Sequence, residues 1–175
     1  MLDQAKGDRL QELTSLPPLD SGAPLPSLVT DDSHLLLAYM VSQHDSPSDG
    51  AQPRLVSASS PDKQIAIVRF QTPYGHSFGP PNDEALAGHP LSSHGLKPYS
   101  WFEVLESSWI QSLQEMNSVH PRHRPESFKT YHHYIATFHD STFECVARGF
   151  GVIPHSGSMR SAVERMAQFL EDGAS

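Results

Sequence analysis

Residues 131–153, with the sequence YHHYIATFHDSTFECVARGFGVI, carry the strongest β-strand pattern in the chain. Side chains alternate with period two on both sides of Asp140-Ser141, which is typical of half-buried strands. Asp and Ser are common turn residues because their side chains bond to nearby backbone groups. The segment therefore predicts a β-hairpin that turns at Asp140-Ser141, with Gly149–Ile153 extending it.

Three further strands are predicted before this hairpin. Leu35–Val41 is almost wholly apolar, which is typical of a strand buried on both faces. Ile65–Gln71 is rich in β-branched residues, and Trp101–Leu105 alternates.

Two helices complete the expected domain. Ser108 opens the first, because Gln111 follows three residues later as in a capping box, and Asn117 marks its end. The second runs from Ser158 to Glu171 along an apolar stripe. Strands and helices do not alternate regularly, so we expect an α+β fold, with an antiparallel or mixed sheet of about four to six strands packed by two helices.

The chain has 175 residues, enough for one domain. Residues 1–33 are expected to form an irregular, flexible N-terminal arm, in which Leu2, Leu10 and Leu13 indicate a weak helix that the following prolines stop. Residues 34–175 then form a single α+β domain. We expect a cytoplasmic protein, because there is one cysteine, no secretory signal pattern and no apolar run long enough to span a membrane.

The net charge of the chain limits the classes of partner that we expect. Asp and Glu number 20 against 12 Lys and Arg, which gives a net charge of −8, and the basic residues form no stripe. Nucleic acids and anionic membranes are bound by clustered Lys and Arg, so neither is an expected partner. A protein or small-molecule partner remains, and the oligomeric state is left open.

Residues 72–99 form the longest irregular segment of the expected domain. Ordered loops longer than about 12–15 residues are usually functional, and apolar side chains within this one indicate that it packs down. Its candidate ligand-binding residues are His76, Asn82, Asp83, Glu84 and His89. The prolines before Asn82 fix the backbone, so the acidic pair either faces a ligand or follows Asn82 as the N-cap of a helical turn. The cap is the favoured interpretation.

Candidate catalytic residues are His139 and Glu144, on either side of the expected turn, and Asp83. A carboxylate that faces an imidazole orients it for general-base chemistry. The alternative, which we favour, is a plain cross-strand pair between His139 and Glu144. The adjacent residues His139-Asp140-Ser141 are no catalytic triad, because adjacent side chains do not point at one another.

A divalent metal is a weaker possibility. Zinc and iron sites need about three or four converging ligands, and His76, His89 and His139 are the candidates. No HExxH motif is present, and most of the 11 histidines are expected to be solvated or hydrogen-bonded. No cofactor is predicted. Cys145 lies among apolar neighbours and is expected to be a small core residue.

Three segments stand out as distinctive: FGPPNDEALAGHPL at residues 78–91, FEVLESSWI at 102–110 and FHDSTFECVA at 138–147. They resemble a family of small bacterial proteins of unassigned function. The resemblance spans about residues 65–150 and leaves out the arm and the final helix. It implies no activity and assigns no catalytic residue.

The acidic charge, the long loop and the lack of a catalytic motif favour a non-catalytic binding protein. One form of it is an immunity-like protein that neutralises a basic partner. The alternative is a small metal-dependent or His/carboxylate enzyme with its site between the 72–99 loop and the 132–144 hairpin. A small-molecule carrier, with an apolar pocket behind the loop, is a third possibility.

Overall fold

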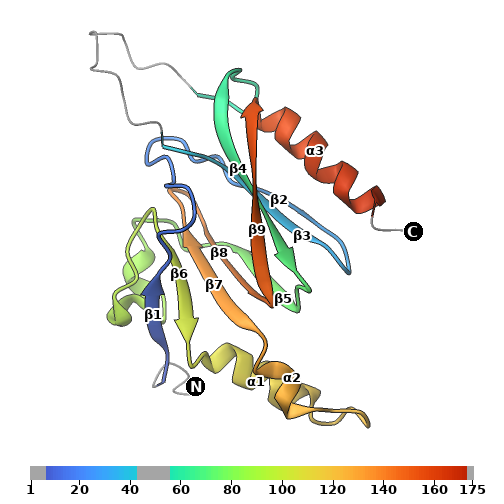
Figure 1. The fold of residues 1–175 in the computed structure, drawn as a ribbon. Coiled ribbons are helices and arrows are strands. Elements are labelled where there is room, and N and C mark those ends of the chain that lie inside the picture. Colours follow the sequence, from blue (N-terminus) through green and yellow to red (C-terminus); the bar gives the residue numbers. More distant parts are fainter. Residues whose placement is uncertain (1–6, 43–55, 173–175) are drawn as a thin grey trace.

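The computed structural model describes residues 7–42 and 56–172, which form two antiparallel sheets and three α-helices (Figure 1). In spatial order, the first sheet contains β1 (Arg9–Glu12), β6 (Trp101–Leu105), β7 (His132–Thr137), β8 (Thr142–Ala147) and β5 (Gly75–Gly79). The second contains β2 (Ser27–Thr30), β3 (Leu35–Met40), β4 (Lys63–Gln71) and β9 (Gly149–Gly157). The helices are α1 (Ser108–Asn117), α2 (Pro125–Phe128) and α3 (Met159–Asp172).

The two sheets pack face to face around an aromatic core. Phe143 of β8 is fully buried, and its ring centroid lies 5.4 Å from Phe70 of β4 and 6.3 Å from Trp101 of β6. Cys145 lies in the same core, as the sequence predicted. Aromatic pairs at this spacing add to the stabilisation that burial itself provides.

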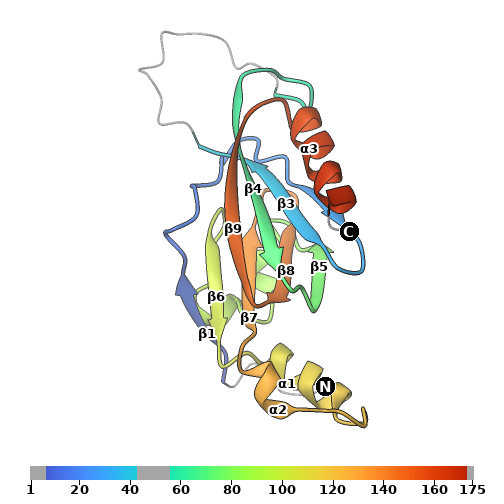
Figure 2. The same ribbon diagram turned by 45° about the vertical axis from the view of Figure 1, so that its right-hand side comes forward.

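Each sheet is also covered on its outer face. Helix α3 packs Met159, Ala162 and Met166 against β3 and β4, and Figure 2 shows the helix lying along the second sheet. Strand β3 is therefore buried on both faces, as predicted from its apolar run. Segment 80–98, with the short 3₁₀ helices η1 (Leu86–Gly88) and η2 (Ser92–His94), covers the outer face of the first sheet.

The expected α+β class is confirmed, but the expected sheet size and helix number are too small. Three strands were missed, β1, β2 and β5, and each lies at a sheet edge; the fourth edge strand, β9, was predicted only over Gly149–Ile153 and as an extension of the hairpin. Strand β9 contains Gly149, Gly151, Pro154 and Gly157, and it pairs with β4 over nine residues rather than extending the hairpin. Long-range pairing overrides the weak strand propensity of such a segment.

The expected irregular arm is also corrected. Leu10 lies in β1, which pairs with β6, so this part of residues 1–33 is a strand and not a helix; Leu2 lies outside the described residues. Leu16 and Leu19 are buried in the core, and the Tyr39 hydroxyl donates a 2.7 Å hydrogen bond to the Pro17 carbonyl. Tertiary contacts thus order a segment that has little local preference of its own.

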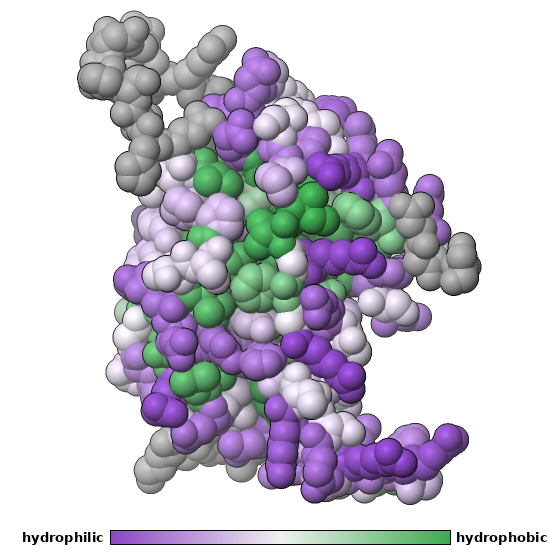
Figure 3. Space-filling model, viewed as in Figure 1, coloured by the Kyte–Doolittle hydropathy of each residue, from purple (hydrophilic) through white to green (hydrophobic). Residues whose placement is uncertain are grey.

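Figure 3 shows hydrophobic side chains on the surface around β9 and α3, bordered by hydrophilic ones, and a hollow in the outline between α3 and the α1–α2 segment.

No helix in the described ranges is both long enough and apolar enough to cross a bilayer.

Replacing Phe143 with alanine tests the shared core. We expect the free energy of unfolding to fall by about 3–5 kcal/mol, because the side chain is fully buried and its removal leaves a cavity between the sheets. Urea unfolding measures the change. Val119→Ala, at a position 88% exposed, is the control and should change stability by less than about 0.5 kcal/mol. Similar losses in both variants would contradict this packing.

Candidate functional site

The candidate site lies on the outer face of the first sheet, where two polar side chains share one face. Glu144 of β8 pairs in register with Ile135 of β7, and Val146 pairs with His133. Side chains two residues apart on a strand point the same way, so Glu144 and His133 are diagonal neighbours on this face. The next residue along β8, Cys145, points to the opposite face and into the core.

Segment 80–98 brings a third polar side chain over this face. Asn82 accepts a 3.0 Å hydrogen bond from the Ala85 backbone N–H, so it caps the turn before η1, as the favoured interpretation predicted. Leu86, Leu91 and Leu96 pack on the sheet around Ile135. This anchoring buries His89, which is 8% exposed, directly beside Glu144.

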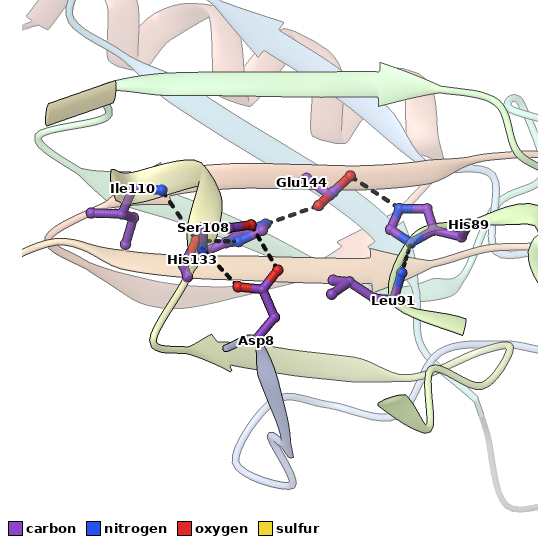
Figure 4. Close-up of polar contacts among 8 residues, drawn as sticks. Asp8, His89, Leu91, Ser108, Ile110, His133 and Glu144 are labelled. Carbon is purple, nitrogen blue, oxygen red and sulfur yellow. Dashed lines mark hydrogen bonds and ion pairs between the residues drawn. The ribbon is translucent and has the colours of Figure 1, made fainter. Parts of the chain in front are cut away.

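The two histidines hold the Glu144 carboxylate between them (Figure 4). His89 Nε2 lies 3.2 Å from Oε1, and His133 Nε2 lies 2.9 Å from Oε2. Both histidines are buried, and the glutamate side chain is 21% exposed. A buried carboxylate needs such donors, because its charge is costly to remove from water.

The other ring nitrogen of each histidine is also hydrogen-bonded. The Leu91 backbone N–H donates to His89 Nδ1 at 3.1 Å. Nδ1 is therefore an acceptor, and Nε2 is the ring nitrogen that donates to Glu144. His133 Nδ1 lies 2.9 Å from Ser107 Oγ, which leaves all four ring nitrogens of the pair engaged.

The histidines keep Glu144 ionised. Burial by itself raises the pKa of the carboxyl group, but the hydrogen bonds and charge interactions with His133 and His89 outweigh it and lower the pKa to about 2. Glu144 therefore carries a negative charge at neutral pH.

The N-terminus of α1 forms a second wall of the site. Ser107 caps this helix, since its Oγ accepts a 3.2 Å hydrogen bond from the Ile110 N–H; the cap lies one residue before the expected Ser108. Asp8 Oδ1 accepts from the Ser108 backbone N–H at 2.6 Å, and Oδ2 accepts from its hydroxyl at 2.8 Å. A carboxylate at this position is favoured by the helix dipole.

A cavity of about 230 Å³ opens between these walls. Six parts of the chain line it: Asp8, Ser77 of β5, residues His89, Pro90 and Leu91, Ser108 and Trp109 of α1, His133 of β7 and Glu144 of β8. The Trp109 ring meets the His133 ring edge to face, with centroids 5.0 Å apart. We call this cavity the Glu144 pocket. It combines two carboxylates with an aromatic and aliphatic wall.

A second polar cluster lies at the hairpin tip. Asp83 Oδ2 accepts a 2.6 Å hydrogen bond from the Tyr99 hydroxyl and lies 2.9 Å from His139 Nδ1. The Asp83 carboxylate raises the pKa of Tyr99 to about 12 and raises that of His139, while its own pKa is lowered by the Tyr99 and His139 hydrogen bonds. Among the described residues, His139 Nε2 has no hydrogen-bond partner.

The predicted site residues thus divide between two places. Glu144 and His89 meet in the Glu144 pocket, whereas Asp83 and His139 form the cluster at the hairpin tip. The expected pair of His139 with Glu144 is wrong, because the β7–β8 loop spans residues 138–141 and Glu144 lies opposite Ile135. Glu84 is exposed, and Asn82 acts as a cap.

The three candidate metal ligands do not meet. His76 lies on β5 opposite Cys145, His89 contacts Glu144, and His139 contacts Asp83. Within residues 7–42 and 56–172, no three His, Cys, Asp or Glu side chains are grouped so that they could hold a metal ion.

Of the nine residues that line the Glu144 pocket, the sequence interpretation named only His89 and Glu144 as candidates. His133 could have been found from the hairpin, because a four-residue loop in place of a two-residue turn puts it diagonal to Glu144. Asp8 and Trp109 could not have been predicted from the sequence. Asp8 lies 100 residues before its partner Ser108, and the pattern around Trp109 is that of a core residue.

The chain matches no model of a known protein family, no curated protein and no solved structure. The resemblance to small bacterial proteins therefore stays a prediction. The geometry of the site is the only support for its assignment as a functional site.

Replacing Glu144 with glutamine tests the buried charge. The lowered pKa stabilises the fold above the ordinary value of 4.5, and this contribution is lost as the pH falls toward about 2. We expect Glu144→Gln to lower the free energy of unfolding by about 3 kcal/mol at pH 6 and by about half of that at pH 3. Urea unfolding at both pH values measures it.

The control for this experiment is Glu106→Gln. Glu106 pairs with Arg9, but both side chains are more than 60% exposed, at 63% and 65%. Its replacement should change stability by less than about 1 kcal/mol at either pH. A Glu144→Gln effect that is equal at pH 6 and pH 3 would contradict the buried ion.

The hairpin-tip cluster is tested by the NMR titration of His139. We expect a pKa above 6.5, because the Asp83 hydrogen bond and charge favour the protonated ring. Asp83→Asn should return the pKa toward its ordinary value, whereas Asp140→Asn, which removes a more distant charge, should lower it much less. Equal effects of the two substitutions would show that the direct contact is absent.

Proposed function

We propose that the protein is a non-catalytic binding protein whose Glu144 pocket captures a small cationic group, an amine or a guanidinium. The observation that carries this proposal is the ionised Glu144 carboxylate, held in a cavity that also contains the Asp8 carboxylate. The cationic group belongs either to a basic protein partner, as in the immunity-like form of the prediction, or to a small molecule.

The charge of the pocket favours a cation. The Glu144 and Asp8 carboxylates both line the cavity, and none of the described residues that line it is a lysine or an arginine. A carboxylate offers about four acceptor positions, and the histidines use two of those on Glu144, so it can accept further donors. The Trp109 ring also lines the cavity, and a cation that stacks on the face of such a ring gains about 0.5–2 kcal/mol.

The size of the pocket favours a small group. Sites for drug-sized ligands measure about 300–1,000 Å³, and the Glu144 pocket has about 230 Å³. A lysine or arginine side chain, or a small amine, matches this volume better than a whole cofactor does. The carrier alternative uses the same pocket for a free ligand.

The hydrogen bonds of the pocket favour binding over catalysis. A general base needs a nitrogen or oxygen free to take a proton from the substrate. Both nitrogens of His89 and both of His133 already have partners. Together with the net charge of −8, this supports a protein that binds a basic group without chemically changing it.

The predicted cytoplasmic location is part of this proposal.

A His/carboxylate enzyme is the second candidate, supported by the contact between Asp83 and His139. The carboxylate orients the ring through Nδ1, and the side chain of His139 is 49% exposed, so Nε2 is accessible to a substrate. That arrangement is one that general bases use. If the His139 titration does not respond to Asp83→Asn, this alternative loses its support.

Ethylguanidinium is the probe that tests the binding function. We expect it to bind saturably, with a dissociation constant near 1 mM, and to shift the NMR signal of the Trp109 indole. Glu144→Gln should weaken binding at least tenfold, because it removes the ionised partner, whereas Glu106→Gln should bind like the unmodified protein. Ethylurea, a neutral molecule of similar shape, should not bind.

Two results would overturn the proposal. One is a Trp109 signal that does not respond to ethylguanidinium, and the other is equal binding by Glu144→Gln and the unmodified protein. One-dimensional and heteronuclear spectra of each variant establish that it is folded before it is titrated.

A further inference from the structure

Strand β5 is an edge strand that borders the Glu144 pocket. We propose that a partner protein binds as an extended segment that pairs with β5 and directs one lysine or arginine side chain into the pocket. This inference rests on the proposed function and names the form in which the cation arrives. β-Strand addition of this kind uses backbone hydrogen bonds for affinity and a side-chain pocket for specificity.

The backbone of β5 offers free hydrogen-bonding groups on one side. Among the described strands, β5 pairs with β8 and lies at the end of its sheet. The Val146 carbonyl accepts a 2.8 Å hydrogen bond from the Tyr74 N–H, so the backbone groups of Val146 point toward β5. Because these directions alternate along a strand, those of His76 and Phe78 point away from β8, to the open edge.

The pairing register of β5 places its open edge close to Glu144. Ser77 pairs with Glu144, so both side chains lie on the outer face, and Ser77 lines the pocket. Neighbouring strands lie about 4.8 Å apart, so a residue opposite Ser77 on an added strand is about 10 Å from the Glu144 backbone. Because the Ser77 side chain is small, it does not block the space between the added strand and Glu144. A lysine or arginine side chain on the added strand is long enough to cross this space and contact the glutamate side chain.

The composition of β5 suits pairing with another strand. Exposed edges are commonly protected by charged residues or proline, as β1 is by Arg9 and Glu12 and β9 by Pro154. The sequence of β5, Gly-His-Ser-Phe-Gly, contains neither proline nor lysine. Phe78 is 38% exposed, and its inner side meets Phe143 with ring centroids 6.3 Å apart, so an apolar residue beside it would extend the core.

These features define the partner segment. It is about five residues long, because Pro73 and Pro80 flank β5, and it carries a basic residue opposite Ser77. Its two neighbours, opposite His76 and Phe78, face the core side and are apolar or β-branched. The acidic pocket supplies the charge complementarity that selects the basic residue.

The test uses the full chain and the peptide acetyl-Thr-Val-Arg-Val-Thr-amide. Antiparallel to β5, its arginine lies opposite Ser77, and its two valine backbones face His76 and Phe78. We expect the peptide to bind at least tenfold more tightly than ethylguanidinium, as measured by calorimetry. N-methylation of both valine amides should remove this gain, because it blocks pairing but keeps the charge. Replacing the arginine with citrulline should weaken binding at least tenfold.

Two variants of β5 test the edge directly. His76→Pro removes the outward N–H without touching a bond to β8, and prolines are tolerated at such edge positions. It should reduce peptide affinity at least tenfold and leave ethylguanidinium binding unchanged. His76→Val, which keeps the N–H, is the matched control and should bind the peptide normally.

The outcomes separate the two proposals. If ethylguanidinium binds but the N-methylated peptide and the unmodified peptide bind equally well, strand addition is overturned and the pocket function stands. If neither ethylguanidinium nor either peptide binds, the proposed function fails, and strand addition to present a basic side chain fails with it.

Discussion

A buried carboxylate has to be surrounded by hydrogen-bond donors, and in this chain that requirement joins segments that are far apart in sequence. Glu144 of β8 is held by His133 of β7 and by His89 of segment 80–98. His133 in turn contacts Ser107, which caps α1. The hydrogen bonds of one carboxylate thus connect strand β8 to β7, to segment 80–98 and, through Ser107, to the start of α1.

Strand β8 connects this polar site to the hydrophobic core. Phe143 and Cys145 point between the sheets, and Glu144 points the other way. The rigid packing of the core thus fixes the direction of the glutamate, as suits a site that holds a ligand in one geometry. Each imidazole nitrogen of the pair already has a partner, and the fixed charge and aromatic wall of the site support the proposed binding of a cation.

The sequence predicted best the elements whose hydrophobic period is strong. The apolar run of β3, the alternation of β6 and β8 and the stripe of α3 each identify an element within about a residue of its bounds. It predicted edge strands poorly, because β1 and β9 are exposed or rich in Gly and Pro and form only through pairing with distant strands. His89 and Glu144 were identified individually, but Glu144 was assigned the wrong partner.

By itself, the sequence determined the α+β class, the acidic charge, the buried cysteine and the residue types available for a site, because these depend on composition and local period. Only the tertiary structure decided which side chains meet. A loop of four residues in place of the expected two shifts the partner of every following residue on β8, so that Glu144 lies opposite Ile135. The contacts of His89 with Glu144 and of Asp8 with Ser108 cross 55 and 100 residues, distances over which local patterns carry no information on contact.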